Sequence, residues 1–347
     1  MRILFVKFGA IGDIVQAAAA LKQVRLSDPL TRIELLTSVG LVDLVSSFNV
    51  ANKVYGIDDS KFLLGRTFKK SVFLLRHIIT LPFILGRYDL IVTAYVDWRY
   101  RLITCLVPCS KRTSFSSESY LRGLIQHRSR IFEYHRLITA KDSEPINIAE
   151  LVNSIGASAL NSSVLEDSNL GPLPDDFVVL IPGGAKNLLR NDDLRRWPIE
   201  NYVGLAKEFL SAGYSVVLVG GLTDEWASSY FSDLNIINLI GKTRLIDLLS
   251  IYEKSKIVIG HDCGPMHIAT LSHAPVLTLF GPTPSNTFFI RNRKYSVYIE
   301  SGNSVSCSPC YDGQNYAACN EAKCMKSISI KEVYDSASNL LATPKID

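Results

Sequence analysis

Short apolar runs alternate with longer segments of helical apolar spacing from the start of the chain. The strand-like runs are residues 2–7, 33–37, 53–57 and 90–94, and the helix-like segments are 14–25, 39–48 and 65–85. Because parallel strands need a crossover, usually helical, this βαβαβ order predicts a parallel sheet with helices on both faces.

The second half of the chain repeats the alternation. The strand-like runs there are residues 177–181, 215–219, 236–240, 256–260 and 275–280, with an amphipathic helix over 199–212. The stretch 161–176 is rich in Ser, Asn, Asp and Pro and predicts a linker. The expected fold is therefore α/β with two doubly wound domains, 1–165 and 166–330, followed by a C-terminal helix and tail over 331–347.

Composition adds one feature to this picture: the two halves of the chain differ in net charge. The 347 residues are 47% hydrophobic, which excludes a disordered chain and suits two domains. Residues 1–150 carry 21 basic and 13 acidic side chains (+8), and residues 151–347 carry 16 and 20 (−4), which together give the net charge of +4. We expect the first half to meet an anionic partner, but not a nucleic acid, because no binding motif accompanies the modest charge.

The opening residues and the cysteines predict a cytoplasmic protein. The segment MRILFVKFGAIGD is interrupted by Lys7 and does not resemble a signal peptide. Seven cysteines in a chain able to form a large core do not indicate a disulfide scaffold. Four of them, Cys307, Cys310, Cys319 and Cys324, have spacings that could bind zinc, but reduced thiols in a surface loop are the favoured interpretation. No metal and no cofactor are expected.

Unusual residues follow the predicted strands, at the sheet edge where ligands bind in such folds. The first strand runs into GxxGD, not the dinucleotide fingerprint GxGxxG, and Gly9 and Gly12 there allow close backbone approach to a ligand. Asp13 ends this turn, either as a helix cap or as a carboxylate able to act as a general base.

The segment IVIGHDCGPMHIA, residues 257–269, carries the strongest local signal. A buried strand runs into Asp262, and a helix should open at Gly264 or Pro265 with amides suited to a diphosphate. Asp262 and His267 add a carboxylate and an imidazole to the same place. The alternative is that Asp262 caps the helix and His267 is a buried histidine with its hydrogen bonds satisfied.

A basic loop lies between Gly183 and Trp197. It could neutralise a phosphoryl leaving group, or its charges could simply be solvated. Its basic residues are Lys186, Arg190, Arg195 and Arg196.

Together these motifs resemble glycosyltransferase family 9, the ADP-heptose:lipopolysaccharide heptosyltransferases. The matching pieces are MRILFVKFGAIGD, IPGG…RRWPIENY, VVLVGGLTDEWA, NLIGKTRLIDLLSIYEKSKIVIGHDCGPMHIA and VLTLFGPT. The resemblance implies a GT-B fold, in which two Rossmann-like domains face each other across a cleft. It also implies an inverting, metal-independent transfer of a sugar from a nucleotide donor.

The resemblance assigns roles by position. Asp13 matches the catalytic base, Arg195 stands where the family usually has a lysine facing the donor phosphates, and Glu225 matches the carboxylate that holds the donor ribose. The other implied donor-binding residues are Asp262, Gly264, Pro265, Met266, His267 and Thr283. The loop before Trp197 is longer than usual, so Lys186 or Arg190 could make the phosphate contact instead. Thr243 stands where some members have a methionine near the nucleobase, so the resemblance implies the sugar-diphosphate class of donor more directly than its nucleobase.

The segment 61–87 is the expected acceptor side. It carries six basic residues, no acid and interleaved apolar residues, which suits an anionic glycolipid, an anionic leaflet or simply a solvated helix face. In the family, basic residues in this region face a phosphorylated glycolipid. The expected acceptor-binding residues are Gly12, Lys61, Arg66, Lys69 and Lys70.

The resulting hypothesis is a heptosyltransferase that uses ADP-heptose and a lipopolysaccharide core acceptor, with peripheral contact at the cytoplasmic face of the inner membrane. Two alternatives stay open: a relative using another nucleotide sugar or a protein acceptor, and a catalytically inactive nucleotide-sugar binding protein.

Overall fold

The chain folds into two units, the first ending at Leu151 and the second beginning at Val152. The computed structural model describes residues 1–64, 67–95, 97–116, 128–142, 147–163, 171–186, 191–301, 305–312 and 315–343. The division lies before the expected boundary at residue 165, because helix α8 (Ile148–Leu160) packs on the second unit. A Cβ at Gly156 of this helix would lie 1.9 Å from the carbonyl oxygen of Leu271.

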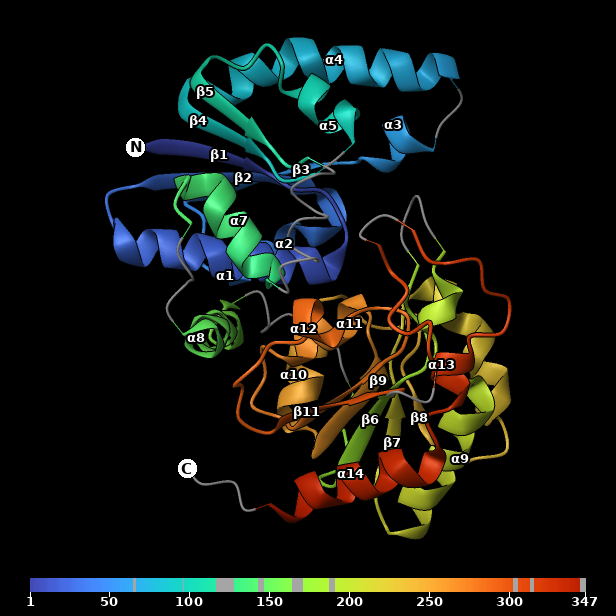
Figure 1. The fold of residues 1–347 in the computed structure, drawn as a ribbon. Coiled ribbons are helices and arrows are strands. Elements are labelled where there is room, and N and C mark those ends of the chain that lie inside the picture. Colours follow the sequence, from blue (N-terminus) through green and yellow to red (C-terminus); the bar gives the residue numbers. More distant parts are fainter. Residues whose placement is uncertain are drawn as a thin grey trace. The chain divides into compact units, whose positions relative to one another are not determined.

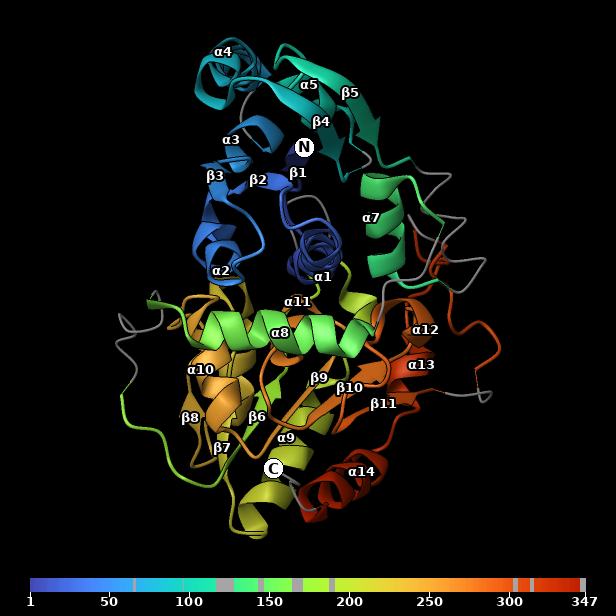
Figure 2. The same cartoon turned by 90° about the vertical axis from the view of Figure 1, so that its left-hand side faces the viewer.

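The first unit is a parallel five-stranded sheet in the order β3-β2-β1-β4-β5. Its strands are β1 (Arg2–Val6), β2 (Arg32–Ser38), β3 (Lys53–Ile57), β4 (Tyr88–Thr93) and β5 (Cys109–Ser114). Its helices are α1 (Ile11–Ser27), η1 (Val39–Leu41), α2 (Val42–Ser47), α3 (Ser60–Leu63), α4 (Thr67–Leu85), α5 (Trp98–Ile103) and α7 (Arg130–Thr139). The α3, α4 and α5 helices cover one face of this sheet, and α1, α2 and α7 cover the other (Figures 1 and 2).

The second unit is a parallel six-stranded sheet in the order β11-β10-β9-β6-β7-β8. Its strands are β6 (Phe177–Ile181), β7 (Ser215–Leu218), β8 (Ile237–Asn238), β9 (Ile257–His261), β10 (Val276–Phe280) and β11 (Ser296–Glu300). Its further helices are η3 (Asp193–Arg195), α9 (Ile199–Ser211), η4 (Leu222–Phe231), α10 (Asp247–Lys254), α11 (Gly264–Ala269), α12 (Ser285–Phe288), α13 (Lys323–Lys326) and α14 (Ile330–Ala342). Counted along the chain this is the Rossmann strand order, which reverses between β6 and β9.

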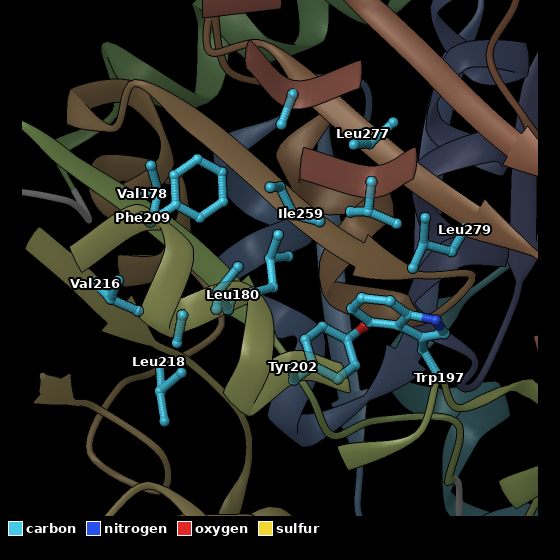
Figure 3. Close-up of a cluster of buried hydrophobic side chains, with 14 of the residues drawn as sticks. Val178, Leu180, Trp197, Tyr202, Phe209, Val216, Leu218, Ile259, Leu277 and Leu279 are labelled. Carbon is cyan, nitrogen blue, oxygen red and sulfur yellow. The ribbon is translucent and has the colours of Figure 1, made fainter. Parts of the chain in front are cut away.

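One face of this second sheet packs on α9 and α14 to form a large apolar core (Figure 3). Leu180 and Ile259 project from neighbouring central strands toward Tyr202 and Phe209 of α9. Trp197 lies beside them, and its indole Nε1 donates a 2.9 Å hydrogen bond to the carbonyl oxygen of Ile328. This packed core supports the central strands β6 and β9, so the ends of these strands are held in fixed positions.

The fold class predicted from the hydrophobic pattern is confirmed, but two strands were not predicted. Both β5 and β11 are edge strands. An edge strand needs no long apolar run: CSKRTS has none, and SVYIE has only the three residues Val297, Tyr298 and Ile299. In the chain as described, no helix is both long enough and apolar enough to cross a bilayer.

Candidate active site

Both units place polar residues where their strand order reverses, between β1 and β4 in the first and between β6 and β9 in the second. In open α/β sheets this switch point is the usual ligand site, because neighbouring loops diverge there and leave a crevice. Asp13 follows β1, and Asp262 follows β9. The predicted base Asp13 and the predicted donor residue Asp262 therefore follow strands that border the two switch points.

Asp13 lies in the first turn of α1 and is held by an ion pair. The N-cap of this helix is Ala10, so the interpretation of Asp13 as a cap is wrong. The ammonium of Lys7 lies 2.9 Å from Oδ2 of Asp13, and the lysine side chain is 1% exposed against 19% for the aspartate. Gly12, the predicted acceptor contact, is buried in the same turn.

Lys7 was not predicted as a functional residue, although a lysine inside an apolar strand pattern was a visible signal. Its ammonium lies 4.5 Å from the ring centre of Tyr95. Burial lowers the pKa of Lys7, the nearby charge of Arg130 lowers it further, and the ion pair with Asp13 partly opposes both. A buried lysine tied to one carboxylate fixes the position of that carboxylate.

Asp262 is the centre of a buried charged cluster in the second unit. Its Oδ2 lies 3.4 Å from Nη1 of Arg195, and its Oδ1 lies 3.5 Å from Nε2 of His267. Burial would raise the pKa of this carboxyl, but hydrogen bonding from His267, the charge of Arg195 and the Thr283 hydroxyl lower it well below its usual range. Asp262 is therefore a carboxylate throughout the physiological pH range.

Arg195 retains unused donor capacity. Both of its ion pairs are long, 3.4 Å to Asp262 and 3.5 Å to Asp192, compared with about 2.8 Å for a strong charged hydrogen bond. Its buried Nε has no hydrogen-bond partner among the described residues. Burial lowers the pKa of Arg195, but nearby groups, Asp262 first and then Tyr316 and Asp192, together raise it by more. A planar cation with five donors held in this way suits the oxygens of a phosphate.

Asp224 links two of the loops around this site and was not predicted. Its Oδ1 accepts a 2.9 Å hydrogen bond from the amide of Gly184, and its Oδ2 accepts one of 2.9 Å from the amide of Gly221. A Cβ at Gly183 would lie 2.3 Å from the carboxyl carbon of Asp224, so only glycine fits there. Its place three residues after Gly221 is the spacing of a helix-capping carboxylate, and this signal could have identified it.

The remaining predicted donor residues differ in their surroundings. Glu225 is exposed, and its Oε1 lies 3.2 Å from the place of a Cβ at Gly241, whose φ is +72°. Lys186 is exposed on the loop after β6, and Arg190 lies outside the described residues. Glu225 and Lys186 are therefore both accessible to solvent, on the segments that follow β7 and β6.

The α11 helix begins at Gly264 with Pro265 in its first turn, as expected, but it is only six residues long. Met266 is buried, its sulfur lies 2.7 Å from the place of a Cβ at Gly260, and its amide donates to the carbonyl of Cys263. The structure therefore gives the Met266 side chain a packing role beneath the site. The side chains of Arg195, Asp262, His267 and Thr283 define the site better than this short helix does.

One functional candidate that prediction missed lies in the cysteine-rich loop. Tyr316 is close enough to Arg195, Asp192 and Asp262 for these charges to act on its pKa, which burial raises. The loop is tied to the turn after β10, because the amides of Cys310 and Tyr311 both donate 3.0 Å hydrogen bonds to the carbonyl of Pro282. Nothing in the sequence around Tyr316 indicates a role, because the tyrosine comes near Arg195 only when its loop folds back onto the turn after β10.

The predicted acceptor residues lie in the first unit. The ammonium of Lys61 lies 3.1 Å from Oδ2 of Asp58, Lys69 and Lys70 lie in the first turn of α4, and Arg66 lies outside the described residues. In the part of the chain that is described, which includes Cys307, Cys310, Cys319 and Cys324, no group of three or more candidate ligands is placed to hold a metal ion.

Two Rossmann-like units define the GT-B class of glycosyltransferase folds. The structure of Escherichia coli heptosyltransferase WaaC with ADP superposes with a TM-score of 0.69 at 15% identity, covering 98% of this chain and 100% of that one. At this identity the likeness concerns the fold.

The sequence model of glycosyltransferase family 9 (heptosyltransferase) matches residues 134–319, more than half of the chain. The chain belongs to this family. It is 33% identical over 96 residues to lipopolysaccharide heptosyltransferase 2 of E. coli K12, a stretch that spans 26% of this chain and 28% of that protein. It is 24% identical over 292 residues to lipopolysaccharide heptosyltransferase 3 of the same strain, covering 78% and 80%.

Proposed function

We propose that this chain is an inverting, metal-independent glycosyltransferase that moves heptose from ADP-heptose to a lipopolysaccharide core acceptor. Family membership supports the reaction class. The names of the two E. coli relatives support the sugar and the acceptor, and the ADP of the WaaC structure supports the nucleotide.

The observation that carries the proposal is the largely buried guanidinium of Arg195, 18% exposed, between Asp262 and Asp192 at the switch point of the second unit. Transfer of a sugar from a nucleotide diphosphate leaves negative charge on the departing phosphate oxygens. A cation that is already oriented and partly shielded from water stabilises this charge with little reorganisation during the reaction. Asp262 orients the guanidinium, and its unused donors are available to the diphosphate.

Asp13 is the proposed general base. Its carboxylate takes the proton of the acceptor hydroxyl, whose oxygen attacks the anomeric carbon while the bond from that carbon to the diphosphate breaks. One displacement inverts the configuration and needs no covalent intermediate. Lys7 holds the carboxylate in place through its 2.9 Å ion pair.

The proposed acceptor side is the basic segment around Lys61, Lys69 and Lys70. We place the protein in the cytoplasm, in peripheral contact with the cytoplasmic face of the inner membrane, where an anionic glycolipid acceptor is available. The absence of acidic residues between Asp59 and Asp89 supports an anionic partner for this segment.

Two experiments test the proposal. Thermal shifts with ADP, UDP and GDP identify the nucleotide, and we expect ADP to stabilise the protein most. Mass spectrometry of the cell's glycolipid with and without this protein should then show the mass of one heptose missing. Loss of a hexose mass instead would show that the transferred sugar is a hexose and not a heptose. A glycolipid of unchanged mass, together with loss of a sugar from a protein, would show that the acceptor is a protein and not a lipid. Nucleotide binding without any transfer would indicate an inactive binding protein.

A further inference from the structure

The outer face of α4 carries an apolar stripe that the fold does not use. Phe68 is 79% exposed and Phe83 is 87% exposed. The stripe consists of Phe68, Val72, Leu75, Ile79 and Phe83, each more than half exposed. At about 100° per residue these five positions lie within an arc of about 80° on the helix.

A different face of α4 attaches the helix to its unit. Leu81 and Leu85 are buried in the apolar cluster beneath the helix, and Phe73 and Leu74 pack against that cluster. A surface helix needs only one apolar face for its own packing. The stripe is therefore additional to what the fold requires, and a contiguous exposed apolar patch of this kind marks an interaction surface.

Charges beside the stripe indicate the partner. Lys69 and Arg76 are exposed at its edge, about 100° and 80° around the helix from Phe68. Lys70 is half-buried, and Arg87 is exposed just beyond the end of the helix. Among the described residues, no ion pair includes Lys69, Lys70 or Arg76, and no acidic residue lies between Asp59 and Asp89 in the sequence.

We infer that α4 is a membrane-docking helix, which lies flat on an anionic bilayer and inserts its Phe68–Phe83 stripe among the acyl chains. Helices that bind in this way combine an apolar face with flanking lysine and arginine side chains. The basic residues attract acidic headgroups, and the aromatic and aliphatic side chains leave water on insertion. The inference deepens the proposed membrane contact, and it names the element that makes it.

Vesicle binding without any nucleotide tests the inference apart from catalysis. We expect the full chain to sediment with phosphatidylcholine vesicles that contain about 30% phosphatidylglycerol, and to bind pure phosphatidylcholine vesicles much less. The double variant Phe68→Gln/Phe83→Gln should bind the anionic vesicles at least about tenfold more weakly, because two large apolar side chains no longer insert. Lys69→Gln/Arg76→Gln should reduce the preference for anionic vesicles.

The matched control is Leu26→Gln/Leu30→Gln, because these leucines are 61% and 90% exposed but lie outside α4. The control should bind vesicles as the parent chain does. Melting curves and ADP-induced thermal shifts show that each variant is folded with an intact second unit, so a failure of docking is distinguished from a failure of the donor site. Absence of parent-chain binding to anionic vesicles, or equal binding by the phenylalanine variant, overturns the inference. A dimer that the phenylalanine variant abolishes, without vesicle binding, overturns it in favour of a second copy of the chain.

Discussion

The ammonium of Lys7 lies 2.9 Å from the carboxylate of Asp13, at the end of the strand that precedes the proposed base. Lys7 is buried and Asp13 is partly exposed. A change at either residue therefore affects both the position of the carboxylate and the stability of the first unit.

Replacing Asp13 with Asn should reduce turnover by about 10²–10⁴-fold, the contribution expected of a positioned base, while ADP binding stays unchanged. It should also destabilise the unit by about 2 kcal/mol, because a buried lysine loses its partner. Calorimetric titration with ADP, steady-state kinetics and urea unfolding measure the three effects.

The double variant Lys7→Met/Asp13→Asn is the control for stability. It removes the buried lysine charge together with its carboxylate partner. Most of the unfolding free energy lost in Asp13→Asn should therefore return, while turnover should stay low. Undiminished turnover of Asp13→Asn would exclude this residue as the base.

Replacing Arg195 with Met should weaken ADP binding about 10–100-fold, since charged hydrogen bonds to the diphosphate are lost. Lys207→Gln removes a positive charge from an exposed position on α9 and should leave the affinity unchanged. Isothermal titration of both variants with ADP gives the comparison. Equal affinities would mean that another cation, such as Lys186, holds the diphosphate.

Gly183→Ala should disturb the loops that Asp224 joins. The new methyl group would overlap the Asp224 side chain, which holds the amides of Gly184 and Gly221. We expect a loss of about 1–3 kcal/mol in unfolding free energy, typical of overpacking, and weaker ADP binding. Gly171→Ala is the matched control, because a Cβ there meets nothing within 4 Å. Identical melting temperatures for the two variants would contradict a structural role for the hydrogen bonds between Asp224 and the two loops.

Glu34 should make the first unit sensitive to acid. It is fully buried, and its carboxylate accepts hydrogen bonds from Arg2 and from the hydroxyl of Tyr88 at 2.6 Å. Burial would raise its pKa, but these partners lower it below the model-peptide value of about 4.3. A lowered folded-state pKa means that the stabilisation is present above that value and is lost as the pH falls through the folded-state pKa.

Glu34→Gln should therefore cost about 2–4 kcal/mol at neutral pH, less than a fully enclosed pair because Arg2 reaches solvent. The difference from the parent chain should shrink below about pH 4. Urea unfolding at several pH values measures it, with the exposed Asp43→Asn as the control. A difference independent of pH would show that shape, rather than charge, explains the effect.

The cysteines should differ strongly in reactivity. Burial raises the pKa of Cys263 to about 12, so this thiol should resist iodoacetamide at about pH 8 until the protein unfolds. Amide hydrogen bonds from Glu321, Ala322 and Lys323 lower the pKa of the half-buried Cys319, which should react faster than the exposed Cys105. Mass spectrometry of labelled peptides over time gives the order. Early labelling of Cys263 would contradict its buried position.

Local patterns predicted most of the elements because central strands buried on both faces are continuous apolar runs. The central strands around Val179 and Ile259 have such runs, whereas the edge strand over Cys109–Ser114 does not. The same patterns placed Asp13 and Asp262 at strand ends, since position in a parallel sheet follows from element order.

The sequence by itself therefore determined the two parallel sheets, the strand ends that carry Asp13 and Asp262, and the charge of the 61–87 segment. Tertiary structure alone decided that Arg195 meets Asp262, 67 residues further along the chain, and that Asp224 joins the loops after β6 and β7. It also decided which side of α4 is buried, leaving Phe68 and Phe83 exposed. Periodicity along a chain reports local geometry, whereas ion pairs between distant segments and the choice of buried face depend on which elements pack together.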